Sequence, residues 1–168
     1  MNHKKTEVMW LGSRQQLDKL SVQQVTVVSS PVTVSSRLRD LGVNIDSQLS
    51  LSGHVNALCR SCYHQLRQLR PVTRSLSEDV IRTLVQAFVS CRLDYCNSLF
   101  YGMTDELFQR IQGIQNAAAR LVTDISRREH ISPALRRLHW LPVQQRVEFK
   151  LALLIHKSLL GSTATLPC

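Results

Sequence analysis

The sequence lacks long hydrophobic runs and has little glycine and proline. Its longest unbroken apolar run, Leu151–Ile155, is far shorter than the roughly 20 residues that a membrane-spanning helix needs, so we predict no membrane insertion. Six Gly and five Pro in 168 residues exclude collagen-like and low-complexity chains, and an apolar content of 43% is too high for a chain that is disordered throughout. The chain is therefore expected to fold, as one domain or slightly more.

Acidic residues are also scarce. Twenty-one Lys and Arg face twelve Asp and Glu, which leaves a formal charge of +9. Residues 1–46 hold six basic and four acidic side chains, hence +2, whereas residues 47–168 hold fifteen and eight, hence +7. Sixteen of the cations are Arg, whose planar guanidinium binds phosphate or carboxylate through two hydrogen bonds and also serves in interface ion pairs. We expect an acidic partner.

The N-terminus carries no signal-peptide pattern. Its first twelve residues include Lys4, Lys5 and Glu7 and no apolar core segment. The five cysteines are an odd number, so we expect reduced thiols and an intracellular location, in the cytoplasm or the nucleus.

The cysteines allow two interpretations. Small apolar core residues are the default, because both cysteine pairs fall inside predicted helices and not on a knuckle turn, which leaves a zinc site as the alternative. The side chains that such a site would use are Cys59, Cys62, Cys91, Cys96 and His54 or His64.

Residues 1–48 are typical of extended structure. Alternation from Thr6 to Leu11 predicts a strand before the Gly12-Ser13 turn, the valines between Val22 and Val34 predict further strands, and Leu41–Asp46 predicts a last one. From about residue 50 the hydrophobic period changes from 2 to 3.6. The fold class that we predict is α+β, a small N-terminal antiparallel sheet followed by a mostly helical bundle of about five helices over residues 49–161, with 162–168 as a disordered tail. The predicted helices cover about 50–70, 77–100 and 104–122, one that starts at Ser132-Pro133, and 142–161.

Two of these helices carry unusual patterns. In the 77–100 helix, Arg92 falls within the apolar stripe, so we expect a carboxylate or several carbonyls around it. That stripe consists of Ile81, Leu84, Val85, Phe88, Tyr95 and Leu99. The apolar residues of the last helix occupy more than one face, so this helix is either central to the bundle or packs on something that the chain lacks.

Five short blocks of the sequence stand out, namely Asn2–Val8, Leu41–Asp46, Cys91–Leu99, Ile114–Leu121 and Leu138–Val143. Their order resembles the C-terminal part of reverse transcriptases from non-LTR (LINE-type) retrotransposons. The resemblance spans roughly residues 2–161, and several co-linear blocks are more specific than one motif.

The resemblance implies that residues 1–48 are the end of the polymerase palm and residues 49–161 the thumb and the connector. Lys5 matches the palm lysine near the incoming nucleotide, which is thought to assist departure of pyrophosphate. Leu41, Gly42 and Val43 match the hairpin that holds the primer end. The upstream palm and fingers would be a missing partner polypeptide.

Polymerase chemistry needs carboxylates that hold two Mg²⁺ ions about 4 Å apart. The family supplies them from an aromatic-x-Asp-Asp motif and an earlier strand, both upstream of the lysine block. This sequence has no Asp-Asp pair, and its adjacent carboxylates, Glu78-Asp79 and Asp105-Glu106, fit the first turns of helices. We therefore expect no cofactor, no metal site and no polymerisation by this chain alone.

The basic side chains most suited to nucleic acid lie in two groups. The first falls in residues 47–76, which contain no acidic side chain, and consists of Arg60, His64, Arg67, Arg70 and Arg74. The second consists of Arg120, Arg127, Arg128, Arg136 and Arg137. A solvated basic face is the alternative, and the resemblance favours contact with RNA or an RNA–DNA hybrid. Because aromatic residues make up only 5% of the chain, we expect contacts to the backbone, weakened by salt.

Other functions have less support. A triad of Asp94, His139 and Ser98 lacks the Gly-x-Ser-x-Gly turn of a hydrolase nucleophile. We interpret His139-Trp140 as a packing corner, with the Trp in the core and the His satisfied by the backbone. Two further hypotheses are a helical module that binds an acidic protein and a product of a decayed element without selected function.

Overall fold

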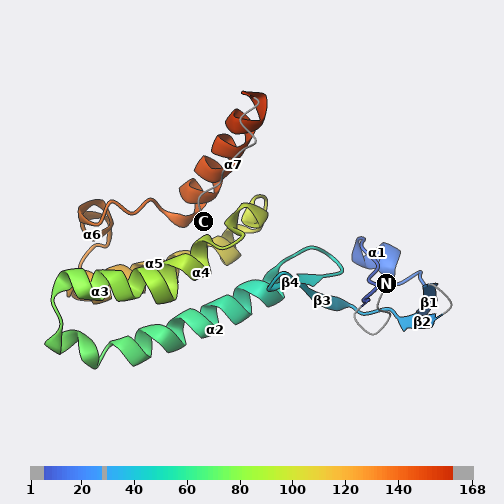
Figure 1. The fold of residues 1–168 in the computed structure, drawn as a ribbon, viewed down its shortest axis with the longest axis horizontal. Coiled ribbons are helices and arrows are strands. Elements are labelled where there is room, and N and C mark those ends of the chain that lie inside the picture. Colours follow the sequence, from blue (N-terminus) through green and yellow to red (C-terminus); the bar gives the residue numbers. More distant parts are fainter. Residues whose placement is uncertain (1–5, 28–29, 161–168) are drawn as a thin grey trace. The chain divides into compact units, whose positions relative to one another are not determined.

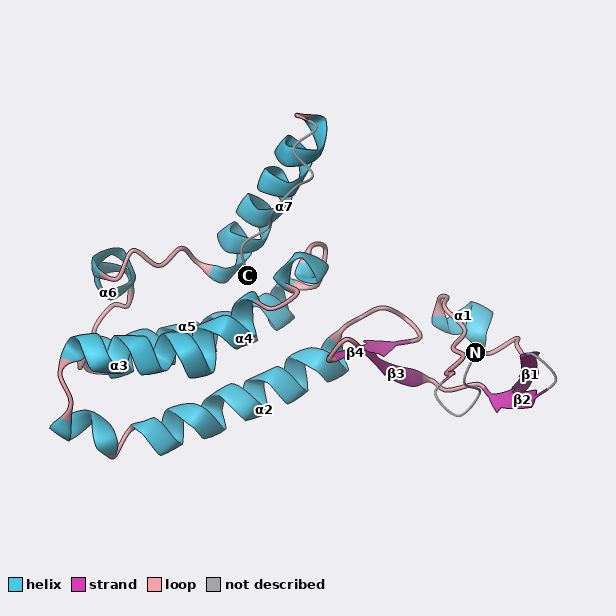
Figure 2. Ribbon diagram, in the orientation of Figure 1, coloured by secondary structure: helices cyan, strands magenta, loops and turns pink. Residues whose placement is uncertain are grey.

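The structure is a computed structural model that describes residues 6–27 and 30–160 (Figure 1). The chain divides into two compact units, Met1–Ala57 and Leu58–Cys168. Short strands precede a helical region, so the predicted α+β class is confirmed (Figure 2). Within the described ranges, no helix is both long enough and apolar enough to cross a membrane. The predicted tail, 162–168, lies outside the described residues.

The first unit contains two antiparallel hairpins. Its first helix or strand is a short helix that the sequence did not predict. Among the described residues β1 pairs with β2 and β3 pairs with β4, and no ladder joins the two pairs. The predicted small antiparallel β-structure is thus confirmed, and its strands are divided between two two-stranded sheets. The elements are α1 (Arg14–Leu17), β1 (Gln24–Val27), β2 (Ser30–Thr33), β3 (Arg37–Asp40) and β4 (Val43–Asp46).

The predicted strand at Thr6–Leu11 forms only one bridge, a parallel pairing of Val8 with Val34. The Ser35 amide donates to the Val8 carbonyl at 2.8 Å, and the Gly12 amide donates to the Ser47 carbonyl at 3.0 Å. This segment thus forms backbone hydrogen bonds with residues that flank β2 and β4.

A two-residue turn connects β3 to β4. Asp40 pairs with Val43, and the two residues between them have positive φ, 44° at Leu41 and 85° at Gly42. Glycine adopts this conformation without a steric penalty, whereas a leucine pays about 1 kcal/mol for it. The Leu41 side chain is 81% exposed, so the hairpin holds an apolar side chain at its tip.

The second unit is helical, and α5 is its central helix. Helix α5 packs on α3, α6 and α7, and its buried residues follow the helical period from Leu107 through Ile111 and Ala118 to Val122. Figure 1 shows α3 alongside α5. The elements are α2 (Ser52–Leu69), which begins in the first unit, the 3₁₀ turn η2 (Val72–Ser75), α3 (Glu78–Val85), the π turn η3 (Gln86–Ser90), α4 (Cys91–Asp94), the 3₁₀ turn η4 (Asn97–Phe100), α5 (Asp105–Thr123), α6 (Ser132–Arg137) and α7 (Val143–Leu159).

Helices α2 and α5 approach each other at Gly113. A Cβ atom on this glycine would lie 3.2 Å from the Tyr63 hydroxyl, which is closer than an ordinary van der Waals contact. The missing side chain therefore makes room for Tyr63 of α2 against α5.

The predicted continuous helix over 77–100 is wrong, because η3 interrupts it and the chain leaves the helix after Asp94. Buried residues recur every fourth position, at Ile81, Val85, Val89 and Leu93, instead of every 3.6. A π turn is wider than an α turn, so it rotates the following residues around the axis. The predicted stripe residues Phe88, within the π turn, and Tyr95 and Leu99, beyond the end of α4, are exposed.

The same rotation moves Arg92 to the surface. Its guanidinium donates to the Ser61 hydroxyl of α2, and the side chain is exposed. The expectation of a buried Arg92 among carboxylate or carbonyl partners is therefore wrong.

Helix α7 binds the end of α4 through two cations. Arg146 forms an ion pair with Asp94 at 2.5 Å, and Lys150 Nζ donates to the Asp94 carbonyl oxygen at 3.3 Å. The carbonyls at a helix C-terminus lack partners within the helix, so Lys150 satisfies one of them. These contacts fix the point at which the chain leaves α4.

One face of α7 is buried and the other is apolar but exposed. Val147 is 1% exposed, whereas Phe149 is 62% and Leu159 81% exposed. Among the described residues α7 is thus not central to the bundle. That it packs on something the chain lacks stays a prediction.

We expect neighbouring substitutions on α7 to have opposite outcomes. Val147→Ala removes two buried methyl groups and should lower the free energy of unfolding by about 2 kcal/mol. Phe149→Gln changes an exposed side chain and should shift it by less than about 0.5 kcal/mol. Chemical denaturation followed by circular dichroism measures both. Equal destabilisation by the two substitutions would contradict the orientation of α7.

The Asp94 carboxyl should titrate above its usual range. Burial raises its pKa above the ordinary value of 3.8, and the charges of Arg146 and Lys150 oppose but do not cancel this effect. Because the folded-state pKa is the higher one, the contribution of Asp94 to stability is complete below pH 3.8 and is lost as the pH rises through the folded-state value.

Carbon-13 NMR titration of Asp94 tests this. We expect a midpoint above 3.8, and a still higher one in Arg146→Met, which removes the nearest cation. A midpoint below 3.8 in the unmodified chain would show that the ion pair outweighs burial.

Candidate nucleic-acid interface

A basic stripe runs along the exposed face of α2. Arg60, His64 and Arg67 are spaced by four and three residues, which places them on one face of the helix, and all three are exposed. The opposite face is buried at Cys62 and Leu66. The amphipathic sequence thus turns the basic side chains outward because the apolar residues face the core. We use the name α2 basic stripe for these three residues.

The α2 basic stripe continues into the following turn. Arg70 directly follows α2 and Arg74 lies in η2, and both side chains are exposed. All five basic residues of the first predicted group are therefore at the surface of the second unit.

No ion pair neutralises these side chains in the part of the chain that the structure describes. The ion pairs found there join Arg137 to Glu78 and Arg146 to Asp94. Since residues 47–76 contain no Asp or Glu, neither α2 nor η2 supplies a carboxylate. Exposed charges act over about 8 Å at physiological salt, so neighbouring cations of the stripe add to one local positive potential.

The second predicted group does not form one comparable surface. Arg137 pairs with Glu78, and the Arg120 guanidinium donates to the Glu129 carbonyl at 3.3 Å while its Nε is buried without a hydrogen-bond partner. Arg120 therefore connects the end of α5 to the following loop. The remaining members, Arg127, Arg128 and Arg136, are exposed.

The matches to the palm lie in the first unit. Leu41 and Gly42 form the turn between β3 and β4, and Val43 opens β4 with 4% of its surface exposed. Lys5 lies outside the described residues.

The cysteines are divided between the core and the surface. Cys59 and Cys62 are buried, which confirms the default interpretation for this pair, whereas Cys91 is exposed and Cys96 half-buried. Cys168 lies outside the described residues. Burial raises the pKa of the Cys62 thiol to about 11. Over residues 6–27 and 30–160, no three His, Cys, Asp or Glu side chains are grouped so as to hold a metal ion.

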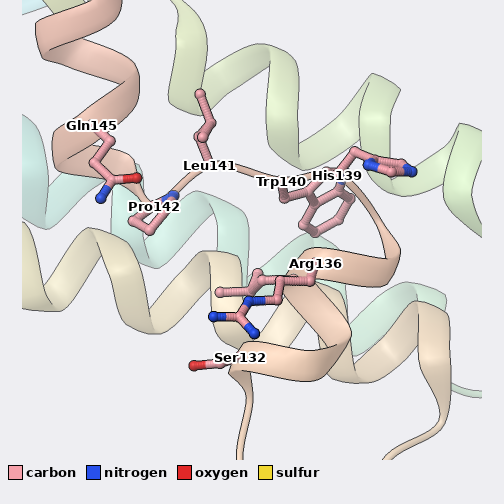
Figure 3. Close-up of a pocket in the computed structure, with 8 residues that line it drawn as sticks. Ser132, Arg136, His139, Trp140, Leu141, Pro142 and Gln145 are labelled. Carbon is pink, nitrogen blue, oxygen red and sulfur yellow. The ribbon is translucent and has the colours of Figure 1, made fainter.

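An open pocket of about 520 Å³ lies at the corner between α6 and α7 (Figure 3). It is lined by Ser132, Leu135, Arg136, His139, Trp140, Leu141, Pro142 and Gln145. Trp140 is half-buried at the pocket wall, so the corner was predicted correctly but the placement of Trp140 in the core is wrong. The Leu-His-Trp-Leu-Pro block was the signal that pointed to this place in the sequence.

The thiols should differ in reactivity. Iodoacetamide at pH 8 should modify Cys91 in the folded chain, whereas Cys62 should react only after denaturation, because it is buried and its pKa is about 11. Mass spectrometry of the digested protein identifies the modified thiols, and the same reaction in guanidinium chloride is the control. Modification of Cys62 at the rate of Cys91 without denaturant would contradict its burial.

The comparisons with known proteins give one line of similarity. The chain is 25% identical over 114 residues to the probable RNA-directed DNA polymerase from transposon BS of Drosophila melanogaster. The match covers 62% of this chain and 13% of that polymerase, so the chain spans a small part of the relative. No protein-family model and no solved structure matches. The chain is thus similar, over most of its length, to a region of a transposon RNA-directed DNA polymerase.

Proposed function

We propose that this chain corresponds to the C-terminal region of a LINE-type reverse transcriptase and binds the backbone of an RNA–DNA hybrid without catalysing polymerisation itself. In this proposal residues 1–48 are the end of the palm and residues 49–161 the thumb and connector. The similarity to a transposon polymerase supports the relation.

The observation that carries the binding proposal is the α2 basic stripe. Its cations are exposed, and no ion pair engages them among the residues described. Phosphates of a nucleic acid are spaced regularly, and a row of cations on one helix face can contact several of them. Arg is suited to this contact because its guanidinium binds a phosphate through two hydrogen bonds.

The β3–β4 hairpin is the candidate for contact with the primer end. Its turn holds Leu41 at an exposed tip with positive φ, a conformation that costs energy in a leucine. Strained, exposed turn residues are concentrated at functional sites, which supports the match of Leu41, Gly42 and Val43 to the primer grip.

We assign no catalysis to this chain, because this sequence holds no Asp-Asp pair that could bind two metal ions. Asp105 and Glu106 occupy the first turn of α5, and Glu78 is engaged by Arg137. The metal-holding carboxylates would come from the palm and fingers polypeptide, with Mg²⁺ as the ion of the complete enzyme.

Salt dependence of hybrid binding tests the proposal. We expect an RNA–DNA hybrid to bind the chain at low salt, with log affinity falling linearly as log salt rises. Arg60→Ala and Arg67→Ala should each lower the magnitude of that slope by about one, because each removes one phosphate contact. Fluorescence anisotropy of a labelled hybrid measures the affinities.

The matched control is Arg82→Ala, which removes the same charge from an exposed position on α3. It should leave the slope within error of the unmodified chain. Equal effects of Arg82→Ala and Arg67→Ala would show that binding depends on the net charge of the chain and not on the α2 basic stripe. Absence of hybrid binding at low salt would overturn the proposal.

A helical module for an acidic protein is the second candidate, and the exposed apolar face of α7 at Phe149 and Leu159 favours it. An exposed apolar face is typical of protein interfaces. A partner that the chain captures from nuclease-treated lysate, and loses on Phe149→Gln but not on Arg67→Ala, would support this function over nucleic-acid binding.

A further inference from the structure

The pocket at the α6–α7 corner is the feature that the proposed backbone contact leaves unexplained. Its floor and walls come from one short stretch, residues 132–145. The Trp140 amide donates to the Leu135 carbonyl at 2.8 Å and the His139 amide to the Arg136 carbonyl at 3.0 Å, which folds Trp140 back over α6. His139 has a φ of 55° at this reversal.

The rim of the pocket is held by α5. Gln115 Nε2 donates to the Leu141 carbonyl at 2.8 Å, and the Val143 amide donates to Gln112 Oε1 at 2.9 Å. Gln115 is 1% exposed, so the side chain that holds this rim is fixed in the core. The pocket is therefore shaped by hydrogen bonds from α5 and not only by surface side chains, as a preformed ligand site requires.

The lining combines an aromatic wall with a cation. Trp140, Leu135 and Pro142 supply apolar surface, while Arg136 and Gln145 supply polar groups, and no Asp or Glu lines the pocket. In Figure 3 Trp140, Pro142 and Arg136 surround one hollow, and the His139 ring points away from it. A volume of about 520 Å³ is within the range of small-molecule sites.

Arg136 differs from its neighbour in having no ion pair within the described residues. Arg137 binds Glu78, whereas Arg136 is exposed beside Trp140 and neither an ion pair nor a side-chain hydrogen bond engages it there. A ligand that satisfies both walls has a flat aromatic part for the indole and an anionic part for the guanidinium.

We infer that this pocket holds one unstacked nucleotide of a single-stranded nucleic acid, with the base against Trp140 and the phosphate on Arg136. This inference rests on the proposed nucleic-acid binding, but it places a base contact where that proposal has only backbone contacts. Base–aromatic stacking tolerates any base, so the site would add affinity for single strands without reading their sequence.

Two oligonucleotides of equal charge separate base from backbone binding. One is an octamer of deoxyadenosine and the other an abasic strand with the same number of phosphates. Anisotropy of the labelled strands should show about fivefold or tighter binding of the octamer with bases. In a Trp10→Phe background, where Trp140 is the remaining tryptophan, the octamer should quench the indole emission and the abasic strand should not.

The variants assign the contact within the pocket. Arg136→Ala should weaken octamer binding about fivefold, and Arg137→Ala, with the same loss of charge, should weaken it clearly less. Trp140→Leu should remove the difference between the two strands. If that variant loses its cooperative melt, the arginine pair and the quenching of Trp140 decide the question in folded chains.

The outcomes distinguish this site from the α2 basic stripe. Equal affinity for both strands with unchanged Trp140 emission overturns the pocket inference, whether or not the hybrid binds. Base-dependent quenching without salt-dependent hybrid binding upholds the pocket and overturns the proposed hybrid contact. A polyglutamate peptide that quenches Trp140 as strongly as the octamer would overturn the assignment to a nucleotide.

Discussion

Two glutamine side chains of α5 hold the C-terminal third of the helical unit in place. Gln112 accepts from the Val143 amide, which is one of the unpaired N–H groups at the start of α7, and Gln115 donates to the Leu141 carbonyl. Gln112 also donates to Gln115, so the two amides act together. Leaving such a buried amide unpaired costs about 1–3 kcal/mol. The pocket at the α6–α7 corner and the contact of α7 with the end of α4 both depend on this connection.

The charges of the helical unit serve two different purposes. Several cations that lie between elements have a partner. Arg146 and Lys150 bind Asp94, and Arg137 binds Glu78. Arg120 donates to the Glu129 carbonyl. The cations of the α2 basic stripe are exposed, and no ion pair engages them within the described chain. This separation suits a surface for phosphates, since a cation that already has a partner is less available to a phosphate. Packing of α2 on the core does not by itself explain why its exposed face lacks carboxylates.

The sequence predicted those helices whose limits are determined by residues close to one another in the chain. The limits of α2 and α5 follow from helical periodicity, from Pro71 and from the acidic first turn of α5, and the basic face of α2 follows from the same periodicity. Distant contacts decide the rest. Gln112 accepts a hydrogen bond from Val143, which comes 31 residues later in the chain. No residue type marks the π turn η3, whose extra width moved Arg92 out of the core. The division of the strands into two sheets rests on backbone pairing, which carries no side-chain signal.

The central claim is that the α2 basic stripe, with Arg70 and Arg74, is where this chain meets a nucleic acid backbone. Arginine footprinting with phenylglyoxal tests it directly, because a guanidinium on a phosphate is shielded from the reagent. In complex with an RNA–DNA hybrid at low salt, Arg60, Arg67, Arg70 and Arg74 should be protected relative to the free chain, while Arg82 should react unchanged. Equal reactivity of the four arginines in the free and the bound chain, or protection that is strongest at Arg82, would contradict the account.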